Sequence, residues 1–109
     1  MNPTTEIMAI IGGTGFDRIS GFRELERKNV ETPYGNPSGS LILGQLGERE
    51  FLFLPRHGSE HGILPHRINY RANIHALNQA GVKRVIALAA VGGIAGHMLP
   101  GDVVLPDQI

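Results

Sequence analysis

Hydrophobic residues along the chain fall into short runs that glycine- and proline-rich turns separate. The first run, Ile7–Ile11, ends in glycines and predicts a buried strand. Two further runs, Ser40–Gln45 and Arg49–Leu54, lie on either side of Gly47 and predict a hairpin. The stretch between the first strand and the hairpin, residues 21–39, is polar and contains several prolines and glycines, which predicts a loop.

The second half of the chain predicts one helix and two more strands. A helix is predicted over Pro65–Ala80, because proline suits an early helical position and Gly81 suits the position just past the end. Residues 82–93 form a mostly apolar run that ends in two glycines, and residues 101–109 predict a last short strand. The apolar face of the predicted helix consists of Ile68, Ala72, Ile74 and Leu77.

The order strand, helix, strand between Phe51 and Val91 implies a right-handed parallel unit. Parallel sheets need cover on both faces, and one helix cannot cover both faces of about five strands. We therefore expect the α/β class, with a mixed, largely parallel sheet and flanking helices. We also expect residues 1–109 to be the N-terminal part of a single longer domain.

Composition narrows the classes of function. Ten basic residues balance ten acidic ones, which removes the electrostatic argument for nucleic acid or an anionic membrane as a partner. The chain has no cysteine, so disulfides, thiolate metal sites and a cysteine nucleophile are excluded. No apolar run approaches the roughly 18 residues that span a bilayer, and the N-terminus does not resemble a signal peptide. A cytoplasmic location is the default expectation.

The stretch "IIGGTGF" leads a predicted strand into glycines, where backbone N–H groups can point at an anion and Thr14 adds a hydroxyl donor. It is not a Walker loop, because no Gly-Lys-Ser/Thr follows. A dinucleotide fingerprint needs a glycine where the chain has Arg18, which disfavours a nucleotide-dependent reductase. A plain glycine turn that closes a strand remains the structural alternative.

The stretch "FLFLPRHGSEHG" places charged and imidazole side chains directly after a predicted strand. His57 and His61 are four residues apart, but the intervening glycine and the position of Glu60 do not fit a helical zinc motif. We therefore predict no metal site. Arg56 can bind phosphate bidentately and an adjacent imidazole N–H can add a hydrogen bond, so an anion fits better. The alternative is a solvated loop in which Arg56 pairs with Glu60.

A third candidate, "ALAAVGG" at Ala87–Gly93, places small residues at a strand end, where a ligand can approach the backbone. Packing of a helix on the sheet explains the same residues equally well. No role can be assigned to Glu60, His61 or His66, and Asp102 is most simply a turn residue.

Taken together, these motifs resemble a known family. The chain contains, in order, "IIGGTGF", "TPYGNPSG", "LPRHGSEHGILPHRINYRANIHALNQAGVKRVIALAAVGGI" and "LPGDVVLPDQI". This series resembles the 5′-methylthioadenosine phosphorylases of the trimeric purine nucleoside phosphorylase family. The residues of "AAVGGI" and "LPHRINYRANI" are most similar to those of the 5′-methylthioinosine phosphorylase subgroup. The resemblance implies a nucleoside phosphorylase-like fold, a homotrimer, purine salvage, and no metal or organic cofactor, with phosphate as a co-substrate.

The resemblance also implies a reaction, in which phosphate attacks C1′ of a 5′-methylthio purine nucleoside and releases the base and 5-methylthioribose 1-phosphate. By motif, Thr14, Arg56 and His57 would bind phosphate, and the backbone at Ala89 and Ala90 would lie against phosphate and ribose. Many relatives carry a hydroxyl or amide residue in place of Ala89, so a side-chain contact is lost there.

Members of this family are more than twice as long as this chain. The part of their sequence beyond the resemblance contains the residues that recognise the purine base. No catalytic residue is therefore assigned within residues 1–109, and we expect this portion alone to be inactive. A general purine nucleoside phosphorylase is one alternative. A non-catalytic phosphate- or nucleotide-binding module is another, if the protein ends at residue 109.

Overall fold

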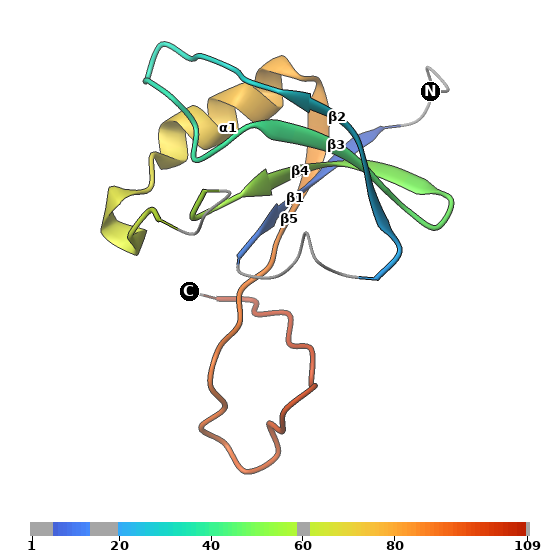
Figure 1. Cartoon of the computed structure of the whole chain (residues 1–109). Helices are drawn as coiled ribbons and strands as arrows, with labels where there is room; N and C mark the ends of the chain where they lie inside the picture. The colour runs from blue at the N-terminus through green and yellow to red at the C-terminus, as the bar shows by residue number, and fades with distance from the viewer. Residues whose placement is uncertain (1–5, 14–19, 59–61, 109) are drawn as a thin grey trace.

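The structure is a computed structural model that describes residues 6–13, 20–58 and 62–108. Five strands form one sheet in the order β2-β3-β4-β1-β5 (Figure 1). β1 runs parallel to both β4 and β5, whereas β2, β3 and β4 pair antiparallel. The predicted α/β class with a mixed sheet is confirmed. The strands are β1 (Ile7–Gly12), β2 (Phe22–Lys28), β3 (Leu41–Leu46), β4 (Arg49–Pro55) and β5 (Val82–Ala87).

The connection from β4 to β5 contains the helix α1 (Tyr70–Gln79), as predicted, but the helix begins later than Pro65. Pro65–Arg67 instead form a separate 3-10 turn, and the backbone is extended again at Ile68. The Oδ1 atom of Asn69 accepts a hydrogen bond from the backbone N–H of Ala72 at 3.1 Å and caps α1. The asparagine cap therefore sets the start of the helix, rather than the proline.

The buried face of α1 shares only Ala72 and Leu77 with the predicted face. Ile74 was predicted to be buried but is 55% exposed, whereas Asn73 is 2% exposed. The residues of α1 that face the sheet recur at spacings of three and four, which places Ile74 on the open side of the helix. The buried residues of α1 are Ala72, Asn73, Ala76 and Leu77.

Two apolar clusters lie on the two faces of the sheet. Adjacent residues of β1 belong to different clusters, because side chains alternate along a strand. The cluster beneath α1 contains Ala9, Leu41, Leu54, Ala76 and Leu77. The cluster on the other face contains Ile10, Ile42, Phe51 and Phe53, with Phe22 packed against it.

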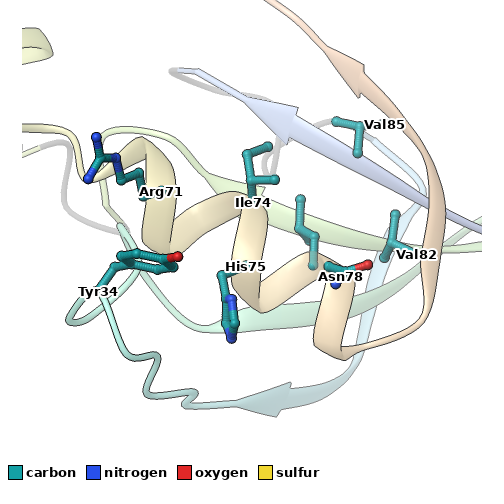
Figure 2. A pocket seen from close by; sticks show the side chains of 8 residues that line it. Tyr34, Arg71, Ile74, His75, Asn78, Val82 and Val85 are labelled. Atoms are coloured by element: carbon teal, nitrogen blue, oxygen red, sulfur yellow. The ribbon is translucent and has the colours of Figure 1, made fainter.

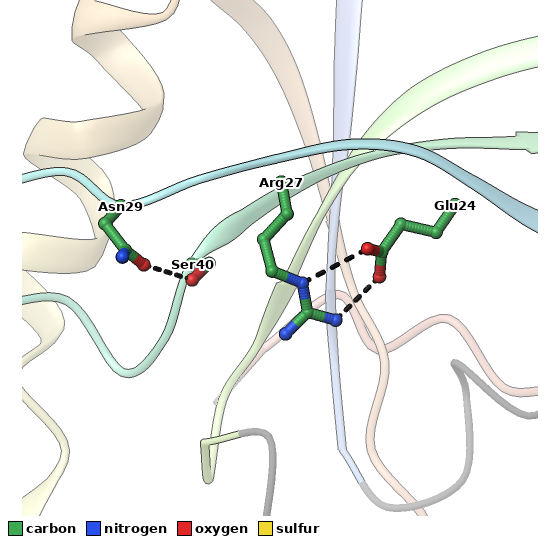
Figure 3. A network of polar contacts seen from close by, with 4 residues as sticks. All are labelled: Glu24, Arg27, Asn29 and Ser40. Carbon is green, nitrogen blue, oxygen red and sulfur yellow. Dashed lines mark hydrogen bonds and ion pairs between the residues drawn. The ribbon is translucent and has the colours of Figure 1, made fainter.

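The prediction that residues 21–39 form only a loop is wrong, because this stretch contains the strand β2. Phe22–Lys28 pair with β3 along the edge of the sheet, with an irregularity between Glu24 and Glu26. The prediction failed because the residues of β2 are mostly charged and exposed, and so show no apolar run in the sequence. Only the backbone pairing with β3 identifies them as a strand. Figure 3 shows the ion pair between Arg27 and Glu24, with Nη2 to Oε1 at 2.6 Å.

The predicted strand at residues 101–109 is also wrong, because residues 101–108 belong to no strand. The segment that follows β5 extends away from the sheet (Figure 1). Beyond Leu88, its backbone hydrogen bonds close local turns, such as that from Asp102 N–H to the Leu99 carbonyl at 3.0 Å. No strand of the described residues pairs with this segment, and the apolar side chains of Val103 and Leu105 are 96% and 93% exposed. Within the described residues, no helix is both long and apolar enough to cross a bilayer.

Candidate functional site

The carboxyl ends of three parallel strands meet at one edge of the sheet. Gly12 of β1 pairs in register with Pro55 of β4, and Ile11 pairs with Ala87 of β5. Backbone hydrogen bonds continue this pairing one residue further. Arg56 N–H donates to the Gly12 carbonyl at 2.9 Å, and Leu88 N–H donates to the Ile11 carbonyl at 2.8 Å. The residues that follow the three strands therefore lie side by side, as open α/β sheets arrange their ligand sites.

The side chain of Arg56 crosses this edge from β4 toward β5. Its Nη1 atom donates to the Leu88 carbonyl at 2.9 Å. Its Nη2 atom lies 2.9 Å from the point that a Cβ atom on Gly13 would occupy. Gly13 thus makes room for the guanidinium at the end of β1. A guanidinium has five N–H donors, and the bond to Leu88 uses one of them.

The ring of His57 is held by the backbone of Ile63. The Nδ1 atom lies 2.9 Å from the Ile63 carbonyl oxygen, and Ile63 N–H donates back to the His57 carbonyl at 3.0 Å. A carbonyl can only accept, so Nδ1 carries a proton in this arrangement. The other ring nitrogen, Nε2, is then an acceptor in the neutral ring. It becomes a donor in the imidazolium, so His57 can donate to an anion only in the charged form.

Gly58 closes the turn that carries Arg56 and His57. Its N–H donates to the Pro55 carbonyl at 3.1 Å, and its φ of 81° is a conformation that glycine adopts readily. A Cβ atom on Gly58 would lie 3.3 Å from the Ser38 carbonyl oxygen. The turn is therefore packed tightly against the loop that contains Ser38.

Of the remaining residues that the sequence singled out, the structure describes only some. Thr14, Glu60 and His61 lie outside the described residues. Ala89 and Ala90 follow Leu88 at the end of β5 and are exposed. Among the described residues, no group of three or more histidine, cysteine, aspartate or glutamate side chains could hold a metal ion.

Two features of the site were not predicted from the sequence. The first is the close approach of Gly13 to Arg56, which depends on the register of two strands that are far apart in sequence. The second is the buried pair of Asn73 and Ser38. Asparagine is an unfavourable residue in the interior of a helix, so Asn73 within the predicted helix was a signal that could have found this pair.

A separate surface hollow lies on the helix side of the sheet (Figure 2). It is open to solvent, and the ring of Tyr34 lies edge-on to the ring of His75, with 5.6 Å between the ring centroids. None of the described residues at the strand-end site lines it. The lining residues are Tyr34, Arg71, Ile74, His75, Leu77, Asn78, Val82 and Val85.

Comparison with known proteins identifies the family. The sequence model of the phosphorylase superfamily matches residues 7–109, which is nearly the whole chain. The chain belongs to the phosphorylase superfamily. This membership gives no support to a nucleotide-dependent reductase, and it agrees with the resemblance found in the sequence.

Two curated relatives are each 50% identical to this superfamily member. One is S-methyl-5′-thioadenosine phosphorylase from Hyperthermus butylicus, aligned over 93% of this chain and 37% of its own length. The other is a probable S-methyl-5′-thioinosine phosphorylase from Xylella fastidiosa strain Temecula1, aligned over 96% of this chain and 42% of its own length. The chain therefore spans about two fifths of the length of these relatives.

A solved structure with a similar fold is that of methylthioadenosine phosphorylase from Schistosoma mansoni in complex with adenine. The TM-score is 0.78 at 40% identity, and the match covers 90% of this chain and 35% of that one. The nucleoside phosphorylase-like fold that the sequence resemblance implied is confirmed.

Proposed function

We propose that this chain forms the phosphate-binding part of an enzyme that cleaves 5′-methylthio purine nucleosides with inorganic phosphate. The position of the Arg56 guanidinium, where three strand ends meet, carries the proposal. Its planar fork matches the geometry of phosphate oxygens. The relatives that are named for thioadenosine and thioinosine phosphorolysis supply the reaction. The products are the free purine and 5-methylthioribose 1-phosphate.

In this reaction the bound phosphate attacks C1′ of the ribose while the bond to the purine breaks. Arg56 and His57 hold the phosphate, His57 donating through Nε2 when its ring is charged. The Thr14 hydroxyl adds a donor, and the backbone at Ala89 and Ala90 lies against phosphate and ribose. These groups favour the reaction by orienting the phosphate against C1′. The bound phosphate anion stabilises the positive charge that develops on the ribose, while the electrons of the breaking bond pass to the purine.

Among purine nucleosides, we place 5′-methylthioinosine first and 5′-methylthioadenosine second. The preference comes from the stretches "LPHRINYRANI" and "AAVGGI", which are most similar to the thioinosine subgroup. Among nucleoside phosphorylases, the alternative is a general purine nucleoside phosphorylase. This alternative stays open because the residues that recognise the purine base are expected outside residues 1–109.

We further propose that residues 1–109 are the N-terminal part of a single domain in a cytoplasmic homotrimer that needs no cofactor besides its co-substrate phosphate. The edge strand β5 supports the first part of this proposal. Strands of parallel sheets are normally covered on both faces, yet Val85 and Ile86, which point to opposite faces, are 44% and 45% exposed.

The test uses the complete gene product with 5′-methylthioinosine, 5′-methylthioadenosine, inosine and adenosine, each with and without phosphate. Released base is separated by chromatography and quantified. We expect base release from the two methylthio nucleosides only when phosphate is present. Equal release in phosphate-free buffer would contradict the proposal. Faster release from inosine or adenosine would favour the general phosphorylase.

The same samples distinguish a non-catalytic phosphate-binding module. Such a module would bind phosphate in a calorimetric titration and release no base from any of the four nucleosides. That pair of results would overturn the enzymatic proposal while keeping the assignment of Arg56.

A further inference from the structure

Asn73 and Ser38 are the buried polar residues of the described part of the chain, at 2% and 8% exposure. Ser38 N–H donates to Asn73 Oδ1 at 2.8 Å, and Asn73 Nδ2 donates to Ser38 Oγ at 3.0 Å. One asparagine side chain thus holds both the backbone and the side chain of Ser38. Because the pair is buried, loss of either bond leaves a polar group without water to replace its partner.

Asn69 makes a second attachment one helical turn earlier. Its Nδ2 atom donates to the Tyr34 carbonyl at 2.8 Å, while its Oδ1 atom caps α1. Residues four apart in a helix lie on the same side. Asn69 and Asn73 therefore fix the loop before β3 at two points, Tyr34 and Ser38.

The fixed loop lies against the turn that carries the proposed phosphate ligands. The Ser38 carbonyl oxygen is 3.3 Å from the point that a Cβ atom on Gly58 would occupy, and Gly58 itself is buried. Gly58 directly follows Arg56 and His57. A shift of Ser38 would therefore remove the surface on which this turn rests.

We propose that Asn73 is a positioning residue for the phosphate site, which it does not itself contact. It holds Ser38 against Gly58 and so fixes the direction in which Arg56 and His57 leave β4. This inference rests on the proposed function, because the turn must bind phosphate for its position to affect the reaction. A merely structural Asn73 would change the stability of the protein and leave the affinity for phosphate unchanged.

The test compares Asn73→Leu with Asn78→Leu in the complete gene product. Asn78 is on the same helix but is exposed, so it controls for the loss of an amide from α1. We expect Asn73→Leu to raise the KM for phosphate by about tenfold, as the loss of a buried polar contact predicts. The KM for the nucleoside should stay within about twofold of wild type, and Asn78→Leu should leave both unchanged. An unchanged phosphate KM in folded Asn73→Leu protein would overturn the proposal.

Ser38→Ala gives a second, milder variant in case Asn73→Leu does not fold. It removes the bond to Ser38 Oγ and keeps the bond from Ser38 N–H. We expect a rise of about threefold in the phosphate KM, and an unchanged value would overturn the proposal.

If wild-type protein releases base without phosphate, the proposed function fails, and the positioning role fails with it. If wild type depends on phosphate and the variants match it, only the positioning role fails.

Discussion

At the scale of single residues, the contact between Gly13 and Arg56 limits what the end of β1 can contain. The Arg56 Nη2 atom is 2.9 Å from the position of an added Cβ atom, which is closer than such atoms normally approach. Because this atom is the end of a flexible side chain, the arginine can move away at little cost in stability. A larger residue at position 13 should therefore affect the site more than it affects the fold.

Gly13→Ala in the complete gene product should raise the KM for phosphate by about tenfold, because the displaced guanidinium loses a charge-assisted hydrogen bond to phosphate. Steady-state kinetics at varied phosphate concentration measure this change. Gly96→Ala is the control, since a Cβ added there would meet no atom of the described residues within 4 Å apart from Gly96 and its chain neighbours. An unchanged phosphate KM in Gly13→Ala would show that the guanidinium position does not matter.

At the scale of elements, the sequence predicted those strands and turns whose signals are apolar runs and glycines. β1, β3 and β4 have such runs, and Gly81, with φ of 86°, ends the helix where predicted. β2 was missed because its residues are charged and its pairing with β3 is a long-range property. A last strand was wrongly predicted from the apolar run near Val103. An apolar run forms a strand only where a neighbouring strand is present to share its backbone hydrogen bonds.

The same distinction applies to the candidate site. The strand ends that carry Arg56 and Leu88 were predicted, because parallel strands place their carboxyl ends at one edge. The bond from Arg56 to the Leu88 carbonyl, and that from Asn73 to Ser38, join segments that are far apart in sequence. No local pattern encodes such bonds, so they required the structure.

The ion pair on β2 gives a prediction about pH. The hydrogen bond and charge of Arg27 hold the pKa of Glu24 below its usual value. A lowered carboxyl pKa contributes stability above the unfolded-state pKa, and this contribution is lost as pH falls through the folded-state pKa. Both side chains are nearly half exposed, so Arg27→Ala should lower the free energy of unfolding at neutral pH by only about 0.5 kcal/mol.

Urea unfolding of wild type and Arg27→Ala at neutral pH and at acid pH measures the effect of this pair. The difference between the two proteins should shrink toward zero in acid, where Glu24 is protonated in both. A difference that stays constant with pH would show that Arg27 acts through packing of its side chain and not through its charge.

At the scale of the whole molecule, the described residues form a sheet whose β5 edge exposes apolar side chains. β5 and the segment after it carry apolar side chains in solvent, including Val91 and Ile94, which are 85% and 101% exposed. The relatives are more than twice as long as this chain. The proposed phosphate site therefore lies at the border of the part described, where residues that bind ribose and purine are expected to meet it.

A protein limited to residues 1–109 should accordingly release no base from 5′-methylthioinosine in the presence of phosphate. The physical reason is that phosphate without an oriented nucleoside gives no proximity effect. The chromatographic assay for free base measures this directly, with the complete gene product as the positive control. Phosphate-dependent release by the 1–109 protein would show that these residues contain a whole site.

The most direct test of the central claim is the phosphate KM of Arg56→Ala in the complete gene product. Arg49→Ala is the matched control, because Arg49 is an exposed arginine at the start of β4, whereas Arg56 directly follows the end of that strand. We predict that Arg56→Ala raises the phosphate KM by at least about tenfold, the value of a hydrogen bond to a charged group, and that Arg49→Ala leaves it unchanged. Equal phosphate KM values for wild type and both variants would contradict the assignment of Arg56 to phosphate.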